Sequence, residues 1–201
     1  YIGIVTICNV PTSTMARNAD WKIFTNAGPE IGVASTKAFT TQLAALLMLA
    51  LSIAKSQDKN AKKRKQATQE LRETPALVDQ AFSLKENISQ ITQNISTKHN
   101  ALFLGRGMYF SIAQEGALKL KEISYIHAEA YPAGELKHGP LALVDEQIPV
   151  IALAPEDSLV EKLLSNLEEV KARGGTLYVF GNANSTIELK KGKFINMPEC
   201  G

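Results

Sequence analysis

An acid, an amine and an imidazole occur close together in one segment of this chain. Glu115, Lys119 and Glu122 follow one another at intervals of four and three residues, which places them on one stripe of a helix. His138 follows in a stretch bounded by Gly134 and Gly139, a composition that favours a loop. General acid–base catalysis uses side chains of these types within reach of one another. This segment is therefore the strongest candidate for a catalytic site.

The spacing of these residues also has a structural interpretation. A glutamate four residues before a lysine stabilises an exposed helix by about 0.2–0.5 kcal/mol, and spacing alone favours that role. However, the charged stripe is framed by apolar residues, which suggests a partly buried site where pKa values shift: Ala117, Leu118, Leu120, Ile123 and Ile126. Loop histidines are mostly solvated, which gives His138 a structural interpretation as well. We expect His127 to lie inside the helix, packed or hydrogen-bonded in the core.

Two further segments could bind an anion. Residues 32–36 place Ser35 and Thr36 at the start of a long helix, where free N–H groups attract phosphates, although either residue could simply cap the helix. Gly105-Arg106-Gly107 follows an apolar run, and its arginine could serve an anion or an acidic neighbour. The sequence has neither a Walker-type phosphate loop nor a complete dinucleotide fingerprint, so we expect no cofactor.

Strand and helix patterns alternate along the chain, as in α/β proteins with parallel sheets. The run of residues 2–8 is apolar at both alternating positions and predicts a strand covered on both faces. A long helix is expected up to about Lys55, and another begins at Pro75, because proline suits a first helical turn. A helix capped by Asp157 or Ser158 should run to Arg173. Further strands are expected at residues 21–25, 101–104, 149–154, 176–180 and 194–197.

A weak internal repeat indicates two modules. The strand pattern of residues 4–9 leads to Ser13-Thr14, and that of residues 177–182 leads to Ser185-Thr186, each before another strand. Two similar doubly wound modules explain this best, although turns in α/β proteins resemble one another in general. Since the chain opens and closes on strand patterns, we expect it to be truncated at both ends of a longer protein.

The composition excludes several classes of protein. The formal net charge of +2 is too small to suggest a nucleic-acid or membrane-surface binder. The apolar run of residues 38–54 falls short of the roughly 20 residues of a membrane span, so we expect a buried helix. The two cysteines, Cys8 and Cys200, imply neither a disulfide framework nor a metal site. A cytoplasmic protein without a metal is expected.

Four segments together resemble one known family. Residues 115–130, 134–142, 25–43 and 102–107 closely resemble the isomerase region of the glucosamine-6-phosphate synthases, which are glutamine–fructose-6-phosphate aminotransferases. The resemblance implies SIS-type (sugar isomerase) modules, each a doubly wound parallel sheet flanked by helices. Residues 1–60 would be the C-terminal part of a first SIS domain, 61–98 a helical connection, and 99–201 most of a second SIS domain.

The resemblance also implies roles for single residues. Glu122 matches the base that moves a proton between C1 and C2 of an open-chain imine, and Lys119 matches its electrostatic neighbour. His138 matches the ring-opening acid/base, which this family lends to the adjacent subunit of a homodimer. Val33 and Ser35, with the adjoining Thr36, match positions at the sugar. The implied reaction converts fructose 6-phosphate and glutamine to glucosamine 6-phosphate and glutamate, without metal or cofactor.

Parts of the family pattern do not occur in these 201 residues. The glutaminase domain expected in the parent chain, the phosphate loop and the lysine that forms a Schiff base with the sugar are all missing, so we expect this chain to be inactive alone. An SIS-fold phosphosugar isomerase or deglycase, and a phosphosugar-sensing regulator, remain alternative functions. The retention of Lys119 and Glu122 argues against the regulator.

Overall fold

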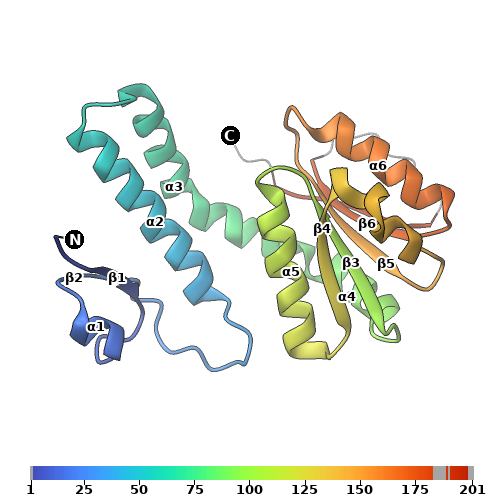
Figure 1. The fold of residues 1–201 in the computed structure, drawn as a ribbon, viewed down its shortest axis with the longest axis horizontal. Helices are drawn as coiled ribbons and strands as arrows, with labels where there is room; N and C mark the ends of the chain where they lie inside the picture. The colour runs from blue at the N-terminus through green and yellow to red at the C-terminus, as the bar shows by residue number, and fades with distance from the viewer. Residues whose placement is uncertain (1, 183–188, 190, 199–201) are drawn as a thin grey trace. The chain divides into compact units, whose positions relative to one another are not determined.

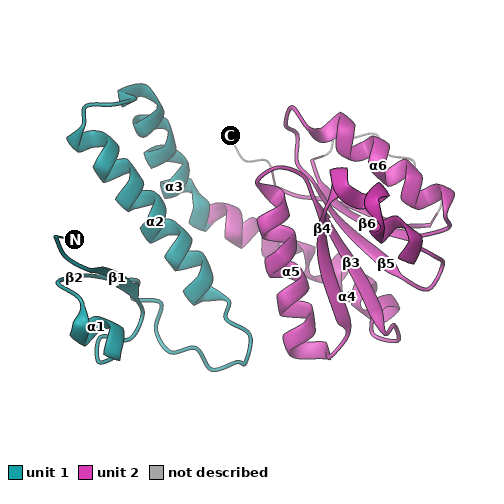
Figure 2. Ribbon diagram, viewed as in Figure 1, with its two compact units in different colours: residues 1–75 teal, residues 76–201 magenta. Residues whose placement is uncertain are grey.

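A computed structural model of the chain describes residues 2–182, 189 and 191–198. The chain divides into two compact units, residues 1–75 and 76–201, which Figure 2 colours separately. Ser185 and Thr186, on which the second copy of the predicted repeat depends, and Cys200 lie outside the described residues.

Unit 1 begins with a pair of parallel strands (Figure 1). β1 (Val5–Cys8) pairs with β2 (Trp21–Phe24) in a register that places Val5 beside Trp21, and α1 (Thr14–Asn18) connects them. The Ser13 hydroxyl caps α1 by accepting a hydrogen bond from the Ala16 N–H at 3.2 Å. Both predicted strands are confirmed, but the prediction that the first is covered on both faces is wrong, because Val5 is 51% exposed.

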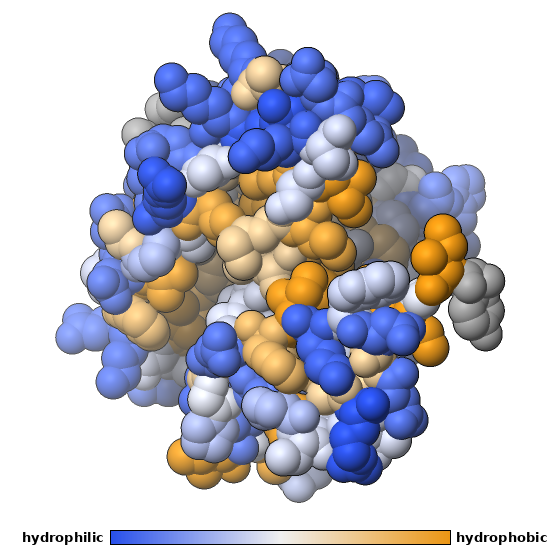
Figure 3. Space-filling model, turned by 90° about the vertical axis from the view of Figure 1, so that its left-hand side faces the viewer, coloured by the Kyte–Doolittle hydropathy of each residue, from blue (hydrophilic) through white to orange (hydrophobic). Residues whose placement is uncertain are grey.

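The long helix predicted after residue 36 is α2 (Lys37–Ser56), and most of its apolar surface is open. We expected a buried helix, yet Ala45 is its one buried residue, and large apolar side chains are exposed at Leu43, Leu46, Leu47, Met48 and Ile53. A pair of strands is too narrow to cover more than one stripe of such a helix. Apolar side chains gather on the face seen in Figure 3. Among the described residues, α2 is the one helix long and apolar enough to cross a membrane, judged by length and composition alone.

α3 (Ala61–Ala81) follows a short turn and continues past the predicted start of a new helix. The prediction that Pro75 begins a helix is wrong, since Pro75 lies inside α3. A proline there removes a single backbone hydrogen bond, while residues on both sides keep their helical conformation. The 3₁₀ helix η1 (Phe82–Leu84) leads to α4 (Lys85–Ile95), which buries Ile91 and Ile95.

Unit 2 is built on a five-stranded parallel sheet in the order β4-β3-β5-β6-β7. The predicted strands are confirmed as β3 (Asn100–Gly105), β5 (Pro149–Ala154), β6 (Thr176–Gly181) and β7 (Gly192–Asn196). The buried strands read as apolar runs, as expected for a parallel sheet covered on both faces. The predicted α/β class, with parallel sheets flanked by helices, is therefore correct.

The sequence did not reveal the edge strand β4 (His127–Pro132). The helix α5 (Tyr109–Ser124) ends at Tyr125, whose left-handed φ of 62° stops it, and the chain then pairs with β3. The prediction that His127 lies in a helix and in the core is wrong, because its side chain is 66% exposed on β4. Alanine and glutamate dominate this strand, and both favour helices over strands.

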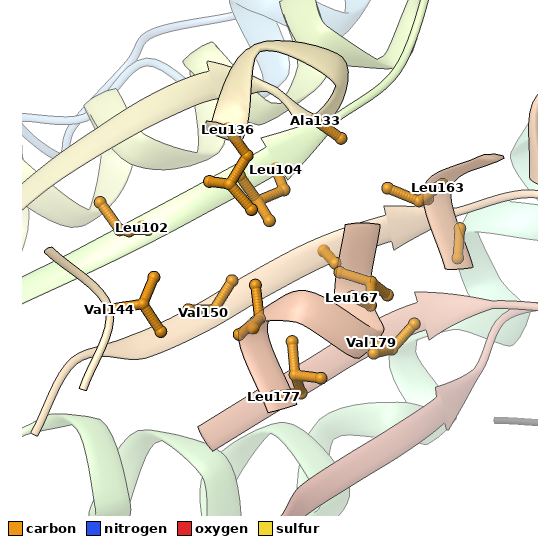
Figure 4. Close-up of a cluster of buried hydrophobic side chains, with 13 residues drawn as sticks. Leu102, Leu104, Ala133, Leu136, Val144, Val150, Leu163, Leu167, Leu177 and Val179 are labelled. Atoms are coloured by element: carbon orange, nitrogen blue, oxygen red, sulfur yellow. The ribbon is translucent and has the colours of Figure 1, made fainter. Parts of the chain in front are cut away.

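Helices cover both faces of this sheet. One face packs against α6 (Val160–Ala172) and the 3₁₀ helix η2 (Ala133–His138), and Figure 4 shows the leucine and valine side chains that meet there. The other face packs against α4 and α5 through a second cluster that includes Ala117 and Tyr178. Leu159 precedes α6 as its cap residue, and the Asp157 carboxylate accepts the Leu159 N–H at 2.8 Å. Gly174, with φ of 81°, follows the end of this helix, where the left-handed conformation stops it.

Candidate active site

The position of α5 is fixed by three close contacts with the sheet. A β-carbon at Gly105 would lie 2.2 Å from the Tyr109 carbonyl oxygen, so glycine is required where β3 turns into α5. Ala113 and Ala117 are buried one turn apart. A β-carbon at Gly116 would lie 2.9 Å from the ring of Phe103 on β3. These small residues bring α5 close to the sheet and leave its charged stripe at the edge of the contact.

Lys119 lies between two carboxylates on this stripe. Its ammonium nitrogen is 2.8 Å from Glu122 Oε2 and 3.3 Å from Glu115 Oε1. The side chains of Lys119, Glu115 and Glu122 are 22%, 23% and 30% exposed, respectively. The predicted helical stripe therefore exists, and it is a partly buried ion-pair cluster rather than a fully solvated helix face.

The electrostatics fix the charge of the amine. The hydrogen bond from Lys119 to Glu122 raises the pKa of the Lys119 ammonium above its usual 10.5, and Glu115 raises it further. Lys119 is therefore a cation at neutral pH, beside a carboxylate that can accept a proton. Such a pair can remove a proton from a substrate carbon and stabilise negative charge on a neighbouring oxygen.

His138 lies at the end of η2, at the start of an exposed turn. Its side chain is 75% exposed, and its Nε2 lies 4.0 Å from Glu135 Oε2. Gly139, with φ of 138°, separates η2 from the 3₁₀ helix η3 (Pro140–Leu143). In the described part of unit 2, no hydrogen bond or ion pair joins His138 to Lys119 or Glu122. The imidazole is presented outward.

Val33, Ser35 and Thr36 belong to unit 1, where they precede α2. Val33 is 87% exposed, and Ser35 and Thr36 are exposed as well. Thr36 occupies the position before the helix, but its side chain makes no capping hydrogen bond. Instead, Glu30 Oε1 accepts the Ala38 N–H at 2.7 Å. A carboxylate from an earlier turn thus caps α2, which the sequence did not reveal.

The Gly105-Arg106-Gly107 turn makes structural contacts. Arg106 Nη1 donates to the Asn166 side-chain oxygen on α6 at 3.1 Å. A β-carbon on Gly134 would lie 3.0 Å from Arg106 Nη1, so the guanidinium packs closely against this glycine. Within the described residues Arg106 therefore bonds a neutral carboxamide rather than an acidic neighbour, and it ties the end of β3 to α6.

A second cluster of titratable side chains, absent from our sequence-based candidates, lies on β4. The Tyr131 hydroxyl donates to Glu129 Oε2, and His127 Nε2 lies 3.3 Å from Glu129 Oε1. These hydrogen bonds, Tyr131 first, lower the pKa of Glu129, and Glu129 raises the pKa of Tyr131. Alternation of polar residues with alanine was the available signal, because period two places all three side chains on one face of a strand.

The potential metal ligands do not converge in the described part of the chain. Nowhere in residues 2–182, 189 and 191–198 do three histidine, cysteine, aspartate or glutamate side chains come together to hold an ion. Cys8 is buried and has a free thiol. The chemistry that the described residues offer is proton transfer between carboxylate, ammonium and imidazole groups.

Comparison with known proteins places this chain in a family. A sequence model of the SIS domain matches residues 2–52 and 94–191. The chain therefore belongs to the SIS domain family. It is 54% identical over 200 residues to the glutamine–fructose-6-phosphate aminotransferase (isomerizing) of Aliivibrio fischeri, and 53% identical over 203 residues to that of Pseudomonas aeruginosa.

The solved structures include a similar fold at comparable identity. The C-terminal domain of glucosamine-fructose-6-phosphate aminotransferase from Francisella tularensis matches with a TM-score of 0.94 and 51% identity, covering 98% of this chain and 56% of that one. The matches to the Aliivibrio and Pseudomonas proteins cover 98% and 100% of this chain. The chain spans about a third of the length of these two relatives, 33% of each.

Proposed function

We propose that this chain is the isomerase part of an enzyme that converts fructose 6-phosphate and glutamine to glucosamine 6-phosphate and glutamate. The Lys119–Glu122 pair on α5 is the observation that carries the proposal. It supplies a base and a cation 2.8 Å apart, in a chain more than 50% identical to aminotransferases of that name.

Glu122 acts as the base in the proposed isomerisation. Ammonia and the C2 carbonyl of the open-chain sugar form an imine with loss of water. Glu122 then takes a proton from C1 while the imine nitrogen takes up a proton, which gives an enolamine. The proton held by Glu122 returns at C2 while the C1 hydroxyl loses its proton, which gives the aldehyde of the amino sugar. A carboxylate can carry a proton from one carbon to the next, and the Lys119 ammonium stabilises charge at the reacting oxygens.

His138 opens the sugar ring in this proposal. Ring opening needs a proton at the ring oxygen and removal of one from the anomeric hydroxyl, and imidazole can do both near neutral pH. The exposure of His138, and its lack of a bond to the Lys119–Glu122 pair within the described unit, support delivery to the neighbouring subunit of a homodimer.

Unit 1 contributes the sugar contacts. Val33, Ser35 and Thr36 would bind the phosphosugar, and their exposure before α2 leaves them accessible. We also propose that residues 1–60 and 99–201 belong to two SIS domains joined by residues 61–98, a division supported by the two matched ranges, 2–52 and 94–191. A glutaminase domain of the same protein would supply the ammonia, in the cytoplasm.

A domain replacement tests this function. The matching third of the Aliivibrio enzyme is exchanged for this chain, and formation of glucosamine 6-phosphate from fructose 6-phosphate and glutamine is measured. We expect activity in the chimera and its loss, by roughly 10²-fold or more, on Glu122→Gln, which keeps the shape but removes the base. Glu161→Gln, in the first turn of α6, is a matched control that should leave activity unchanged.

Two further measurements separate the roles. Glutamine hydrolysis should survive Glu122→Gln, since the lost step is in the isomerase, and exchange of the C1 proton with solvent should stop. A mixed dimer of Glu122→Gln and His138→Ala subunits should recover part of the activity if His138 serves the neighbouring site. A fully active Glu122→Gln chimera would contradict the proposed function. So would an unsubstituted chimera that binds fructose 6-phosphate without turning it over.

A further inference from the structure

Unit 2 contains a cleft at the amino ends of its parallel strands, whereas the Gly105 turn lies at their carboxyl ends. The cleft has a volume of about 520 Å³ and lies between α4 and the amino ends of β5, β6 and β7. Small-molecule sites occupy roughly 300–1,000 Å³, so the cleft has the size of one. Its residues belong neither to the charged stripe of α5 nor to the turn that presents His138.

A buried tyrosine lines this cleft, and it makes no side-chain hydrogen bond within the described part of the chain. Tyr178 on β6 is 4% exposed, and its ring packs in the cluster that includes Ile91 and Ile151. No other described residue makes a hydrogen bond with the Tyr178 hydroxyl. The hydroxyl oxygen is not fully enclosed by protein atoms. Because a buried tyrosine hydroxyl normally has a partner, this one is available to a molecule in the cleft.

The charged groups of the cleft already have partners. Lys193 Nζ donates to Asn87 Oδ1 and Gln90 Oε1 on α4, each at 2.7 Å. Glu146 accepts a hydrogen bond from Lys191 at 2.7 Å, which lowers the pKa of the Glu146 carboxyl group. Lys98, which also lines the cleft, donates to Gln147 Oε1 at 2.9 Å. An anion would have to take Lys193 from two amide oxygens and Lys98 from a third. A divalent cation would find Glu146 as the single carboxylate among the residues that line the cleft.

The groups left open are neutral. Gln93 and Asn94 on α4 line the cleft, and their carboxamides bond no described residue. Thr97 and Thr176 are lining residues with hydroxyls. Carboxamides and hydroxyls both donate and accept, and so do the hydroxyls of a sugar. We propose that the cleft binds a small, neutral, polyhydroxylated molecule of monosaccharide size, at a site separate from the proposed catalytic residues.

A titration of the 201-residue chain with D-glucose, followed by amide NMR, tests this site. We expect saturable shifts at the amides of Thr176 and Gly192, which border the cleft. Tyr178→Phe keeps the buried ring and should weaken binding roughly 2- to 10-fold, the effect of one lost hydrogen bond. Replacing Gln93 and Asn94 together by alanine should abolish the shifts.

Matched controls decide the outcome. Tyr125→Phe makes the same chemical change at a residue that is 93% exposed and does not line the cleft, so it should leave binding unchanged. Inorganic phosphate should produce no saturable shift at Thr176 or Gly192. The inference fails if glucose gives no saturable shift at tens of millimolar, if Tyr178→Phe binds as well as the unmodified chain, or if phosphate binds better than glucose. A dispersed amide spectrum checks that each variant is folded.

Discussion

Lys119 Nζ and Glu122 Oε2 lie 2.8 Å apart on neighbouring turns of α5, and Glu115 on the preceding turn contacts the same ammonium group at 3.3 Å. One cation is therefore shared by two carboxylates of the same helix. The closer carboxylate is the one we propose as the base. Glu115 does not need to contact a substrate to matter, because it helps to hold the amine beside Glu122.

The first prediction concerns the ionisation of Lys119. Its pKa should lie above 10.5 in the folded chain and fall toward that value in Glu122→Gln, with a smaller fall in Glu115→Gln, because Glu122 has the larger effect. The pKa can be measured by NMR titration of the Lys119 side chain. Equal falls in both variants would contradict this prediction, because they would mean that Glu115 raises the Lys119 pKa as much as Glu122 does.

The Lys119–Glu122 ion pair also determines whether the free energy of unfolding rises or falls with pH in the alkaline range. A raised lysine pKa means that the folded state holds the proton more tightly than the unfolded state. Its contribution is therefore fully present below the ordinary value of 10.5 and is lost as the pH rises through the raised pKa. Lys119→Met should remove this part of the alkaline decline in the urea midpoint, relative to the unmodified chain.

The sequence predicted most of unit 2 because its central strands are apolar runs bounded by turns. It failed where a residue pattern and its environment disagree. The α5 stripe was correctly placed by spacing, but β4 is rich in helix-favouring residues, and its pairing with β3 overrides that preference. Likewise, Ser35 and Thr36 have the residue types of a helix cap, whereas the cap comes from Glu30, which only the path of the chain brings to α2.

The second prediction tests this unexpected cap. Glu30→Ala should lower the free energy of unfolding of unit 1 by about 1 kcal/mol, because the Ala38 N–H loses its acceptor. Thr36→Ala is the matched control and should change stability little, since the Thr36 side chain makes no capping hydrogen bond. Hydrogen exchange at the first turn of α2 measures both. A larger effect of Thr36→Ala would return the capping role to the residue expected from sequence.

The third prediction concerns Tyr131 and Glu129 on β4. Since Glu129 has a lowered pKa, its contribution to stability is present above the ordinary value of 4.5 and is lost as the pH falls through the lowered one. Tyr131 has a raised pKa, so its contribution is present below 10.0 and is lost as the pH rises through the raised value. Tyr131→Phe should flatten both declines in urea unfolding.

Tyr125→Phe is the control for this pair, because it removes a hydroxyl that is almost fully exposed. It should leave the acid decline of the unfolding midpoint unchanged. An ultraviolet titration gives an independent reading, in which a tyrosine that ionises above the ordinary value of 10.0 should disappear in Tyr131→Phe. If both phenylalanine variants shift the acid decline equally, the Tyr131–Glu129 hydrogen bond does not set the pKa of Glu129.

The last prediction concerns the contact that places α5 on the sheet. Gly116→Ala gains roughly 1 kcal/mol of helix propensity, but its β-carbon would lie 2.9 Å from the Phe103 ring. Overpacking costs about 1–3 kcal/mol, so the clash should exceed the gain and lower the urea midpoint of unit 2. In the Phe103→Leu background the ring is gone, and Gly116→Ala should stabilise instead. This reversal of sign, measured as a coupling free energy of roughly 0.5–3 kcal/mol in a double-mutant cycle, would show that glycine at position 116 is required by the ring of Phe103. Additive effects of the two substitutions would instead mean that α5 moves away from β3 without cost, and that the Lys119–Glu122 pair is not rigidly held.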